Sequence, residues 1–217
     1  MTRARQLLPG FVARLFLIYA LMIVPWPGLE QGYAALYRSG SNALSSALGL
    51  GHHVLLYVLT EEDRASFAGK ADARALALDD TKIVFRAGGQ ELTVLHSTWY
   101  SGYIPTALLI ALMLATPLRW PLRLRALGWG LLVVNLYLAL RMGSTFIAGG
   151  AIDPFHWLPA PGFRRSLFST LAVTGPGSGI WYVVPLLTWI LLVHRRVYQE
   201  VVVGAGNGPT PSEPSDA

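Results

Sequence analysis

Three kinds of side chain in this sequence could carry out acyl transfer: serine hydroxyls, imidazoles and carboxylates. A serine nucleophile needs a histidine to take its proton and a carboxylate to orient that histidine. The candidates are Ser97, Ser101, Ser144 and Ser178 as nucleophile, His96 or His156 as base, and Asp79, Asp80 or Asp153 as orienting acid. No Gly-x-Ser-x-Gly motif singles out one of these serines. The chain has no cysteine, which excludes thiolate nucleophiles, disulfides and cysteine-ligated metals.

The five histidines could bind a metal or a pigment, but their spacing favours neither. His52 and His53 are adjacent, so their rings point in different directions in a helix or a strand. His96 and His156 lie near one set of apolar-segment ends and His194 near the other, and none belongs to a His-Glu-x-x-His motif. The sequence therefore predicts no cofactor and no metal. Ligation of a haem or chlorin by one histidine stays open, because a single axial ligand leaves no spacing signature.

Three polar side chains lie inside apolar segments, where a charged group costs about 2.5–3.5 kcal/mol at the centre of a bilayer. Arg14 lies one turn into its segment and can extend to the headgroups. Asn135 lies near the middle of its segment, where we expect an interhelical hydrogen bond worth about 1 kcal/mol. Arg141 lies nearer a segment end. It can extend to the headgroups, or hold an anionic group with its planar fork of donors.

The elements that position these residues follow from composition. Hydrophobic residues make up 53% of the 217 residues and charged residues 13%, and the mean hydropathy is +0.45. A soluble domain of this length could not hide that much apolar surface in one core. Four segments approach the roughly 20 residues that a helix needs to cross a bilayer; they cover residues 11–26, 100–118, 127–147 and 180–194. The predicted fold is mainly α, a polytopic membrane helix bundle of about four spans.

Arginine placement predicts the orientation of this bundle, because short cytoplasmic loops retain Lys and Arg. With both termini inside, seven arginines flank inner ends and two lie in the short outer loop; these are Arg3, Arg5, Arg119, Arg123, Arg125, Arg195 and Arg196 against Arg164 and Arg165. We expect a bacterial inner-membrane protein with a membrane domain over residues 1–203, residues 28–99 on the periplasmic side, and a flexible cytoplasmic tail over residues 204–217. The arginines form no continuous basic stripe, so lipid and not nucleic acid is the expected contact.

Residues 28–99 contain two further patterns. Residues 42–59 are apolar enough for a fifth span, but that span would move two arginine-rich loops outside. We therefore expect residues 33–59 to lie along the outer surface as an amphipathic segment, or to re-enter the membrane partway. Residues 82–86 and 91–95 are β-rich and flank Gly88-Gly89, which predicts a β-hairpin.

The order of features over residues 82–145 forms a recognisable pattern. The hairpin is followed by Trp99-Tyr100-Ser101-Gly102-Tyr103, a small-residue apolar helix, an arginine-rich turn, and a helix with Asn135 and Arg141. This pattern resembles the exosortase/archaeosortase family of multi-pass membrane enzymes. The resemblance implies transpeptidation by a Cys ahead of a small residue and Gly, assisted by an Arg and a His. Here Tyr100 stands in the position of that Cys, Arg141 is the residue that would match the Arg, and residues 175–179 are glycine-rich where the His is expected.

These differences would leave the scaffold without the catalytic residues of the family, because a phenol does not replace a thiolate in acyl transfer. We expect a non-catalytic accessory or structural subunit of a larger inner-membrane complex, either energy-converting (respiratory or photosynthetic) or export-related. Its partners would be lipid and other membrane subunits. The alternative is a divergent membrane transpeptidase or protease that uses Ser101 with Arg141 at the outer face. A transporter is disfavoured, because only Asn135 is polar at the middle of a span.

Overall fold

The computed structural model describes residues 2–24, 28–68, 80–150 and 182–193. This part of the chain is mainly helical, as the composition predicts, and it contains one small antiparallel sheet. The elements in chain order are α1 (Thr2–Ile23), α2 (Leu29–Ala47), β1 (Val54–Val58), α3 (Glu61–Phe67), β2 (Thr81–Ala87), β3 (Gln90–His96), a π-helical turn (Trp99–Tyr103), α5 (Ile104–Ala115), α6 (Trp120–Gly150) and a helix over Tyr182–Val193.

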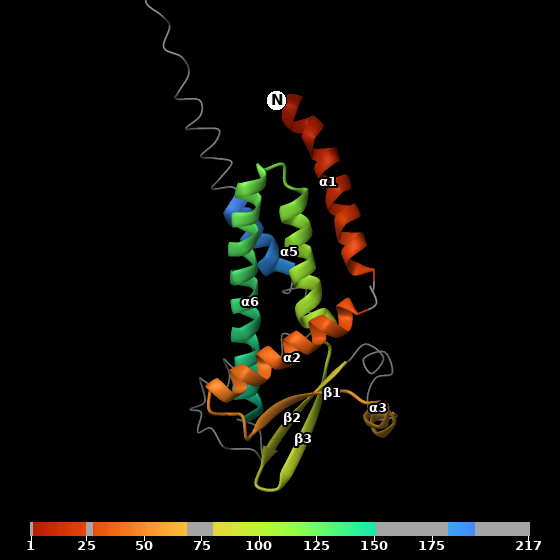
Figure 1. Cartoon of the computed structure of the whole chain (residues 1–217), viewed down its shortest axis with the longest axis vertical. Coiled ribbons are helices and arrows are strands. Elements are labelled where there is room, and N and C mark those ends of the chain that lie inside the picture. Colours follow the sequence, from red (N-terminus) through yellow and green to blue (C-terminus); the bar gives the residue numbers. More distant parts are fainter. Residues whose placement is uncertain (1, 25–27, 69–79, 151–181, 194–217) are drawn as a thin grey trace, which may run out of the picture.

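Helix α5 lies between α1 and α6 (Figure 1). The almost entirely apolar α5 packs against both α1 and α6. Gly130 lets α6 approach closely, since a Cβ there would lie 3.1 Å from a methyl group of Leu109 on α5. The helix over Tyr182–Val193 joins them through Trp189, whose ring stacks on Phe11 at 5.6 Å and whose Nε1 donates to Thr116 Oγ1 at 2.8 Å. The four helices therefore form one packed bundle.

One helix in the described ranges, Trp120–Ile147, is long and apolar enough to cross a membrane, with a mean hydropathy of 1.5. The other predicted spans correspond to shorter apolar helices over Pro9–Ile23, Trp99–Ala115 and Tyr182–Val193. The whole of α6 has 31 residues and is therefore about 46 Å long. It extends beyond the predicted 127–147 segment at both ends.

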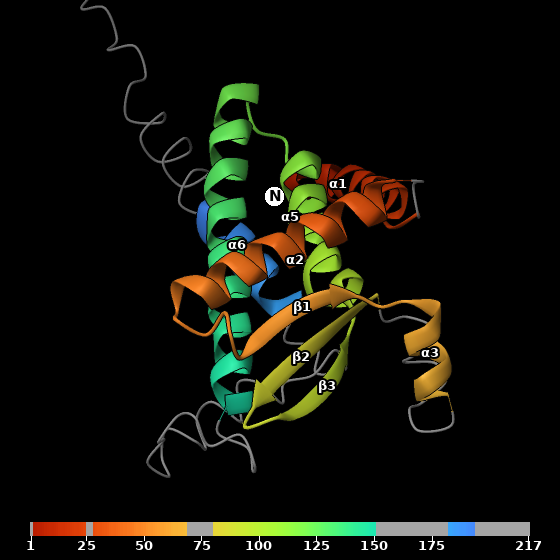
Figure 2. The same cartoon turned by 60° about the horizontal axis from the view of Figure 1, so that its bottom comes forward.

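The second helix, α2, crosses one end of this bundle, and the sheet lies beyond it (Figures 1 and 2). The buried residues of α2 are short, Ala34, Ser41 and Ser45, and stand at helical spacing. Ser45 Oγ donates to the carbonyl of Val54 at 2.8 Å. Short polar side chains therefore bring α2 close enough to hydrogen-bond directly to the backbone of the sheet.

The predicted hairpin is confirmed. β2 and β3 pair antiparallel, with Ala87 opposite Gln90 at the turn and Thr81 opposite His96 at the far end. Gly88 and Gly89 have φ angles of 56° and 81°. A two-residue type I′ turn needs positive φ at both positions, which glycine adopts without a steric penalty.

The interpretation of residues 42–59 as one surface or re-entrant stretch is wrong for its second half, which forms β1. This strand pairs antiparallel with β2, with Val54 opposite Phe85, and gives the sheet order β1-β2-β3. Both residues pack in a buried cluster with Met142 and Phe146 near the end of α6. Periodicity cannot assign a five-residue apolar run such as VLLYV to helix or strand, and the pairing with β2 decides its state.

Candidate functional site

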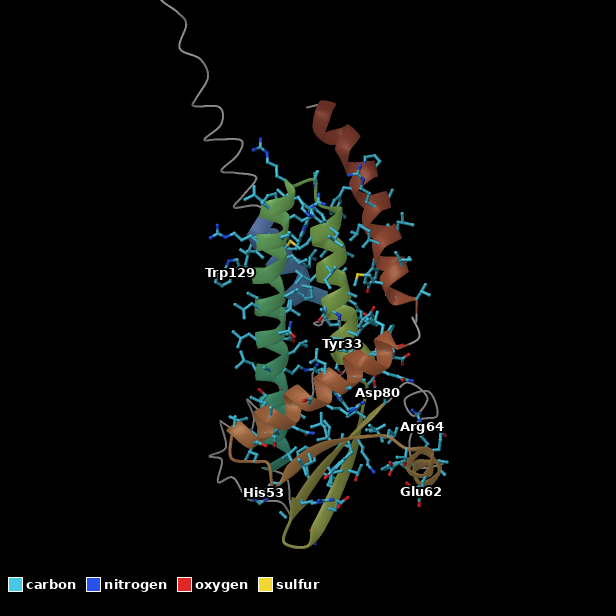
Figure 3. The ribbon with its side chains drawn as sticks, viewed as in Figure 1. Tyr33, His53, Glu62, Arg64, Asp80 and Trp129 are labelled. Carbon is cyan, nitrogen blue, oxygen red and sulfur yellow. The ribbon has the colours of Figure 1, made fainter. Side chains whose placement is uncertain are left out.

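Four parts of the fold meet where the sheet reaches the helical bundle, at a site that we call the junction. It is made of Tyr37 on α2, Asp80 ahead of β2, His96 at the end of β3, Thr98 ahead of the π-helical turn, and Arg141 on α6. Only two residues separate β3 from the turn, so His96 lies directly beside the bundle. Figure 3 shows Asp80 at this level and Tyr33 on α2 beside the start of α5.

His96 and Tyr37 form an aromatic pair in the junction. Their ring centroids are 5.8 Å apart with an interplanar angle of 23°, and the Tyr37 hydroxyl is hydrogen-bonded to His96 Nε2 at 3.3 Å. Desolvation lowers the pKa of His96 to about 4, aided by the positive charge of Arg141 and opposed by Asp80. Desolvation also raises the pKa of Tyr37 well above its ordinary value. Both groups are therefore neutral at pH 7, and the imidazole is a weak base.

The carboxylate of Asp80 ties the sheet to the bundle. One oxygen accepts a hydrogen bond from the Thr98 N–H at 3.0 Å, and the other accepts from the Thr98 hydroxyl. The Asp80 N–H donates to the carbonyl of His96 at 3.3 Å. Both carboxylate oxygens thus bind Thr98, while the imidazole binds Tyr37. Asp80 fixes the backbone at this point and does not orient the imidazole.

Ser101 lies in the π-helical turn and is only 1% exposed. Its Oγ has no hydrogen-bond partner within the described ranges. The neighbouring Gly102 packs under α2, because a Cβ there would lie 2.5 Å from the Tyr33 hydroxyl and 3.0 Å from the Tyr37 ring. Burial under the same contact raises the pKa of Tyr33 to about 12. Ser101 is therefore inaccessible to a substrate in this conformation.

The serine, histidine and aspartate candidates are not assembled into a catalytic triad among the residues that the structure describes. Ser97 Oγ accepts a hydrogen bond from the Tyr100 N–H at 3.4 Å, and Ser144 Oγ donates to the Leu140 carbonyl at 2.8 Å. Neither serine is bonded to a histidine. The other candidates from the sequence lie outside the described residues: Asp79, Asp153, His156, Ser178 and His194.

Arg141, like His96 and Asp80, is a candidate from the sequence that the fold brings to the junction. Its side chain is half-buried with Nε inaccessible to solvent, and its positive charge acts on both Tyr37 and His96. Arg141 and His96 are therefore neighbours. His96 precedes the turn at Trp99, whereas the family resemblance implies a histidine ahead of the apolar segment over residues 180–194.

No group of three His, Cys, Asp or Glu side chains in the described part of the chain could hold a metal ion. His52 is exposed beside the hairpin turn, and His53 Nδ1 lies 3.0 Å from the carbonyl of Arg86. His96 already bonds Tyr37 through Nε2, so a haem or chlorin bound at that nitrogen would have to displace the tyrosine.

Asn135 makes a different hydrogen bond from the interhelical one that we predicted. Its Nδ2 donates to the carbonyl of Leu131 on the same helix at 2.8 Å. The side chain is exposed and lines a groove of about 340 Å³ between α2 and α6. The other walls are mostly apolar or small, and include Leu36, Gly40, Leu138, Ala139 and Met142. A helix can satisfy its own asparagine in this way, so a polar residue within a span does not by itself imply a bond to a second helix.

Two tyrosines that no sequence pattern singled out cover the site. Tyr33 and Tyr37 are four residues apart, and therefore lie on one face of α2. Tyr33 also meets Tyr103 edge-to-face, with centroids 5.4 Å apart and an interplanar angle of 77°. The four-residue spacing was a usable signal for a shared contact, but only the crossing of α2 over the turn identifies what they contact.

Comparisons of this chain with protein-family models, curated proteins and solved structures found no match. The chemistry of the junction therefore rests on its own geometry. A neutral imidazole, an arginine charge and two phenols surround the turn that holds a buried hydroxyl. This arrangement can hold α2, the sheet and the bundle in one geometry, but it contains no nucleophile bonded to a base.

Proposed function

We propose that this chain is a polytopic inner-membrane protein with four spanning helices and both termini in the cytoplasm. The bundle helices carry large apolar side chains that are exposed, including Phe16, Leu17, Leu132, Leu136, Leu140, Leu187 and Leu191. Trp129 is 55% exposed and projects from α6 away from the bundle (Figure 3). So much exposed apolar surface is unfavourable in water and is expected against lipid or a partner.

The ends of α6 support this placement. Arg123 donates to the carbonyls of Thr116 and Leu118 at 3.0 and 3.1 Å and lies 5.0 Å from the Trp120 ring, a combination typical of a membrane interface. Arg141 follows Trp120 by 21 residues, or about 32 Å along a helix. The hydrocarbon core of a bilayer is about 30 Å thick. The junction would then lie at the outer boundary, with α2 along that boundary and the sheet in the periplasm.

Within this placement the protein acts as a non-catalytic accessory subunit of a larger inner-membrane complex, energy-converting or export-related, on an exosortase-like scaffold. The observation that carries this proposal is the burial of Ser101 away from any base. Its hydroxyl is buried, it is bonded to no base, and α2 packs on the adjacent Gly102. Tyr100 takes the place of the thiolate that the family resemblance implies. Other membrane subunits and lipid are the proposed partners.

A divergent transpeptidase or protease is the second candidate. It is favoured by one observation, the closeness of Arg141 to His96, although the charge of Arg141 lowers the pKa of the imidazole. In that enzyme the packing around the turn would have to open to expose Ser101. The imidazole would then regain water and recover its basicity.

Mild-detergent purification at native abundance, followed by mass measurement, tests the accessory function. We expect the chain to co-purify with other membrane proteins, and a lone 23.6 kDa species would contradict the proposal.

The substitutions Ser101→Ala and Arg141→Ala distinguish the accessory subunit from the enzyme. We expect Ser101→Ala to leave assembly unchanged, because its Oγ makes no hydrogen bond. If both variants assemble normally while processing of outer-face proteins stops, the protein is an enzyme.

A further inference from the structure

The two edges of the three-stranded sheet differ in whether their outward backbone groups have hydrogen-bond partners. On the β1 edge, Asn42 of α2 donates to the Leu56 carbonyl at 3.0 Å and accepts from the Leu56 N–H at 2.8 Å. Ser45 binds the Val54 carbonyl next to it. These side chains occupy backbone groups that another strand would otherwise bind. β3 forms the other edge, and within the described ranges it pairs with β2 alone.

The register identifies which backbone groups of β3 face outward. In an antiparallel pair, residues alternate between pairs that exchange hydrogen bonds and pairs whose groups point away. The two-residue turn makes Ala87–Gln90 a bonded pair, so the even-numbered residues of β3 bind β2. The N–H and C=O groups of the odd-numbered residues therefore point to the open edge; these residues are Glu91, Thr93 and Leu95. Six backbone groups stand there in a row at regular spacing.

We propose that the β3 edge binds an extended segment of a partner subunit as a fourth, antiparallel strand of the sheet. This inference rests on the proposed accessory function and specifies the surface through which it operates. An open ladder of alternating donors and acceptors is complementary to extended backbone and to no other common peptide conformation. Because the hairpin extends away from the helical bundle (Figure 1), such a segment can reach it from the aqueous side.

The side chains of β3 define the chemistry of the added strand. Val94 is 41% exposed although it lies on the same face of the sheet as Leu92, which packs against the buried cluster beside α6. A β-branched or aromatic side chain beside Val94 would extend this apolar row. On the opposite face the row of Glu91, Thr93 and Leu95 is mixed, and polar side chains of the partner can be accommodated there.

A second copy of this chain does not fit this edge. β3 runs from the hairpin turn, which is remote from the bundle, toward the junction at the bundle end (Figure 1). Antiparallel pairing of two β3 strands reverses the strand direction between the copies. The helices of the second copy would then extend from the opposite end of the shared sheet, an arrangement that two proteins inserted in the same sense into one membrane cannot adopt.

Proline at position 93 tests the edge with little effect on the hairpin. Thr93→Pro removes one outward N–H and no hydrogen bond to β2, whereas Thr93→Ala keeps that N–H. In the full-length protein purified from native membranes, we expect Thr93→Pro to reduce the co-purified partner by about tenfold or more, while Thr93→Ala retains it. The thermal midpoints of the two variants should agree within a few degrees. Val94→Pro removes an N–H that points toward β2 and should lower the midpoint strongly.

Crosslinking gives a second test that does not depend on proline. A photo-crosslinking amino acid is placed in turn at positions 91 and 95, and at the exposed Ser39 of α2 as a control position. We expect adducts from positions 91 and 95 to map about four residues apart, in reverse order, within one segment of one partner. Adducts to residues 151–181 of the same chain, adducts between two copies, or an intact complex with no such adducts would overturn the inference.

The outcomes separate this inference from the proposal on which it rests. A complex that retains its partner in Thr93→Pro refutes the role of the β3 edge and leaves the accessory function standing. A lone chain in the wild-type purification refutes both.

Discussion

Asn42 closes the β1 edge with one side chain, and replacing it with alanine gives the sharpest test of how α2 and the sheet are held together. Its amide both donates to and accepts from the backbone of Leu56, at 3.0 and 2.8 Å. Leu56 is 3% exposed, so Asn42→Ala leaves one donor and one acceptor without a partner in a poorly hydrated place. The variant therefore removes the two bonds by which Asn42 anchors the C-terminal half of α2 to β1.

The size of the effect follows from the cost of unsatisfied backbone groups. Each buried N–H or C=O that loses its partner costs about 1–3 kcal/mol. Asn42 is itself half-buried, so water entering the vacated space recovers part of that cost. We expect Asn42→Ala to lower the free energy of unfolding by about 2–4 kcal/mol. Exchange of the Leu56 amide hydrogen should be faster by about 30-fold or more if opening is local.

Thermal unfolding in detergent and hydrogen exchange measured by mass spectrometry provide the assay. Asn42→Asp is an intermediate variant, because it keeps the acceptor for the Leu56 N–H and loses the donor to the carbonyl. Ser39→Ala, on the exposed side of α2, is the control and should change the stability by less than about 0.5 kcal/mol. If Asn42→Ala changes neither the stability nor the exchange of Leu56 relative to this control, the edge-sealing argument is refuted.

Two further predictions concern the junction. Gly102→Ala should destabilise the protein by about 1–3 kcal/mol in thermal unfolding, because the added Cβ would lie 2.5 Å from the Tyr33 hydroxyl. The control Gly32→Ala has open space around its Cβ and should be neutral or stabilising. Equal effects of the two substitutions would contradict the close contact at Gly102. His96 should also make stability depend on pH: its pKa is about 4 in the folded protein and about 6.5 when unfolded, so its contribution is complete above pH 6.5 and is lost as the pH falls toward 4. His96→Phe should flatten the thermal midpoint over that range, and an NMR titration of His96 near 6.5 in the folded wild type would refute the burial argument.

The predictable parts of the fold were those with strong local signals. The low charge and long apolar segments predicted a mainly helical chain, and the segment 127–147 lies within α6. The hairpin followed from two β-rich runs around Gly88-Gly89, because that dipeptide can adopt the backbone conformation of the tightest turn. These features are set within a few residues of one another, so one sequence is enough to specify them.

The predictions that were wrong concern residues whose state depends on contacts that the sequence does not display. The strand state of β1 depends on β2, some thirty residues later, and on the amide of Asn42. Asn135 was expected to bond another helix but finds a carbonyl on its own helix. No local pattern contains this information, because each choice is made among competing partners that only the folded chain brings within reach.

By itself, the sequence determined that this chain is apolar, helical and without a cysteine nucleophile, and that its arginines cluster at the ends of apolar segments. Only the tertiary structure decided what the individual polar residues do. Packing around the π-helical turn buries Ser101 without a base, and the crossing of α2 over the turn brings Tyr37 to His96 beside Arg141. The physical reason is that composition and periodicity act along the chain, whereas reactivity depends on which groups share a desolvated space, and that is set by packing between segments far apart in sequence.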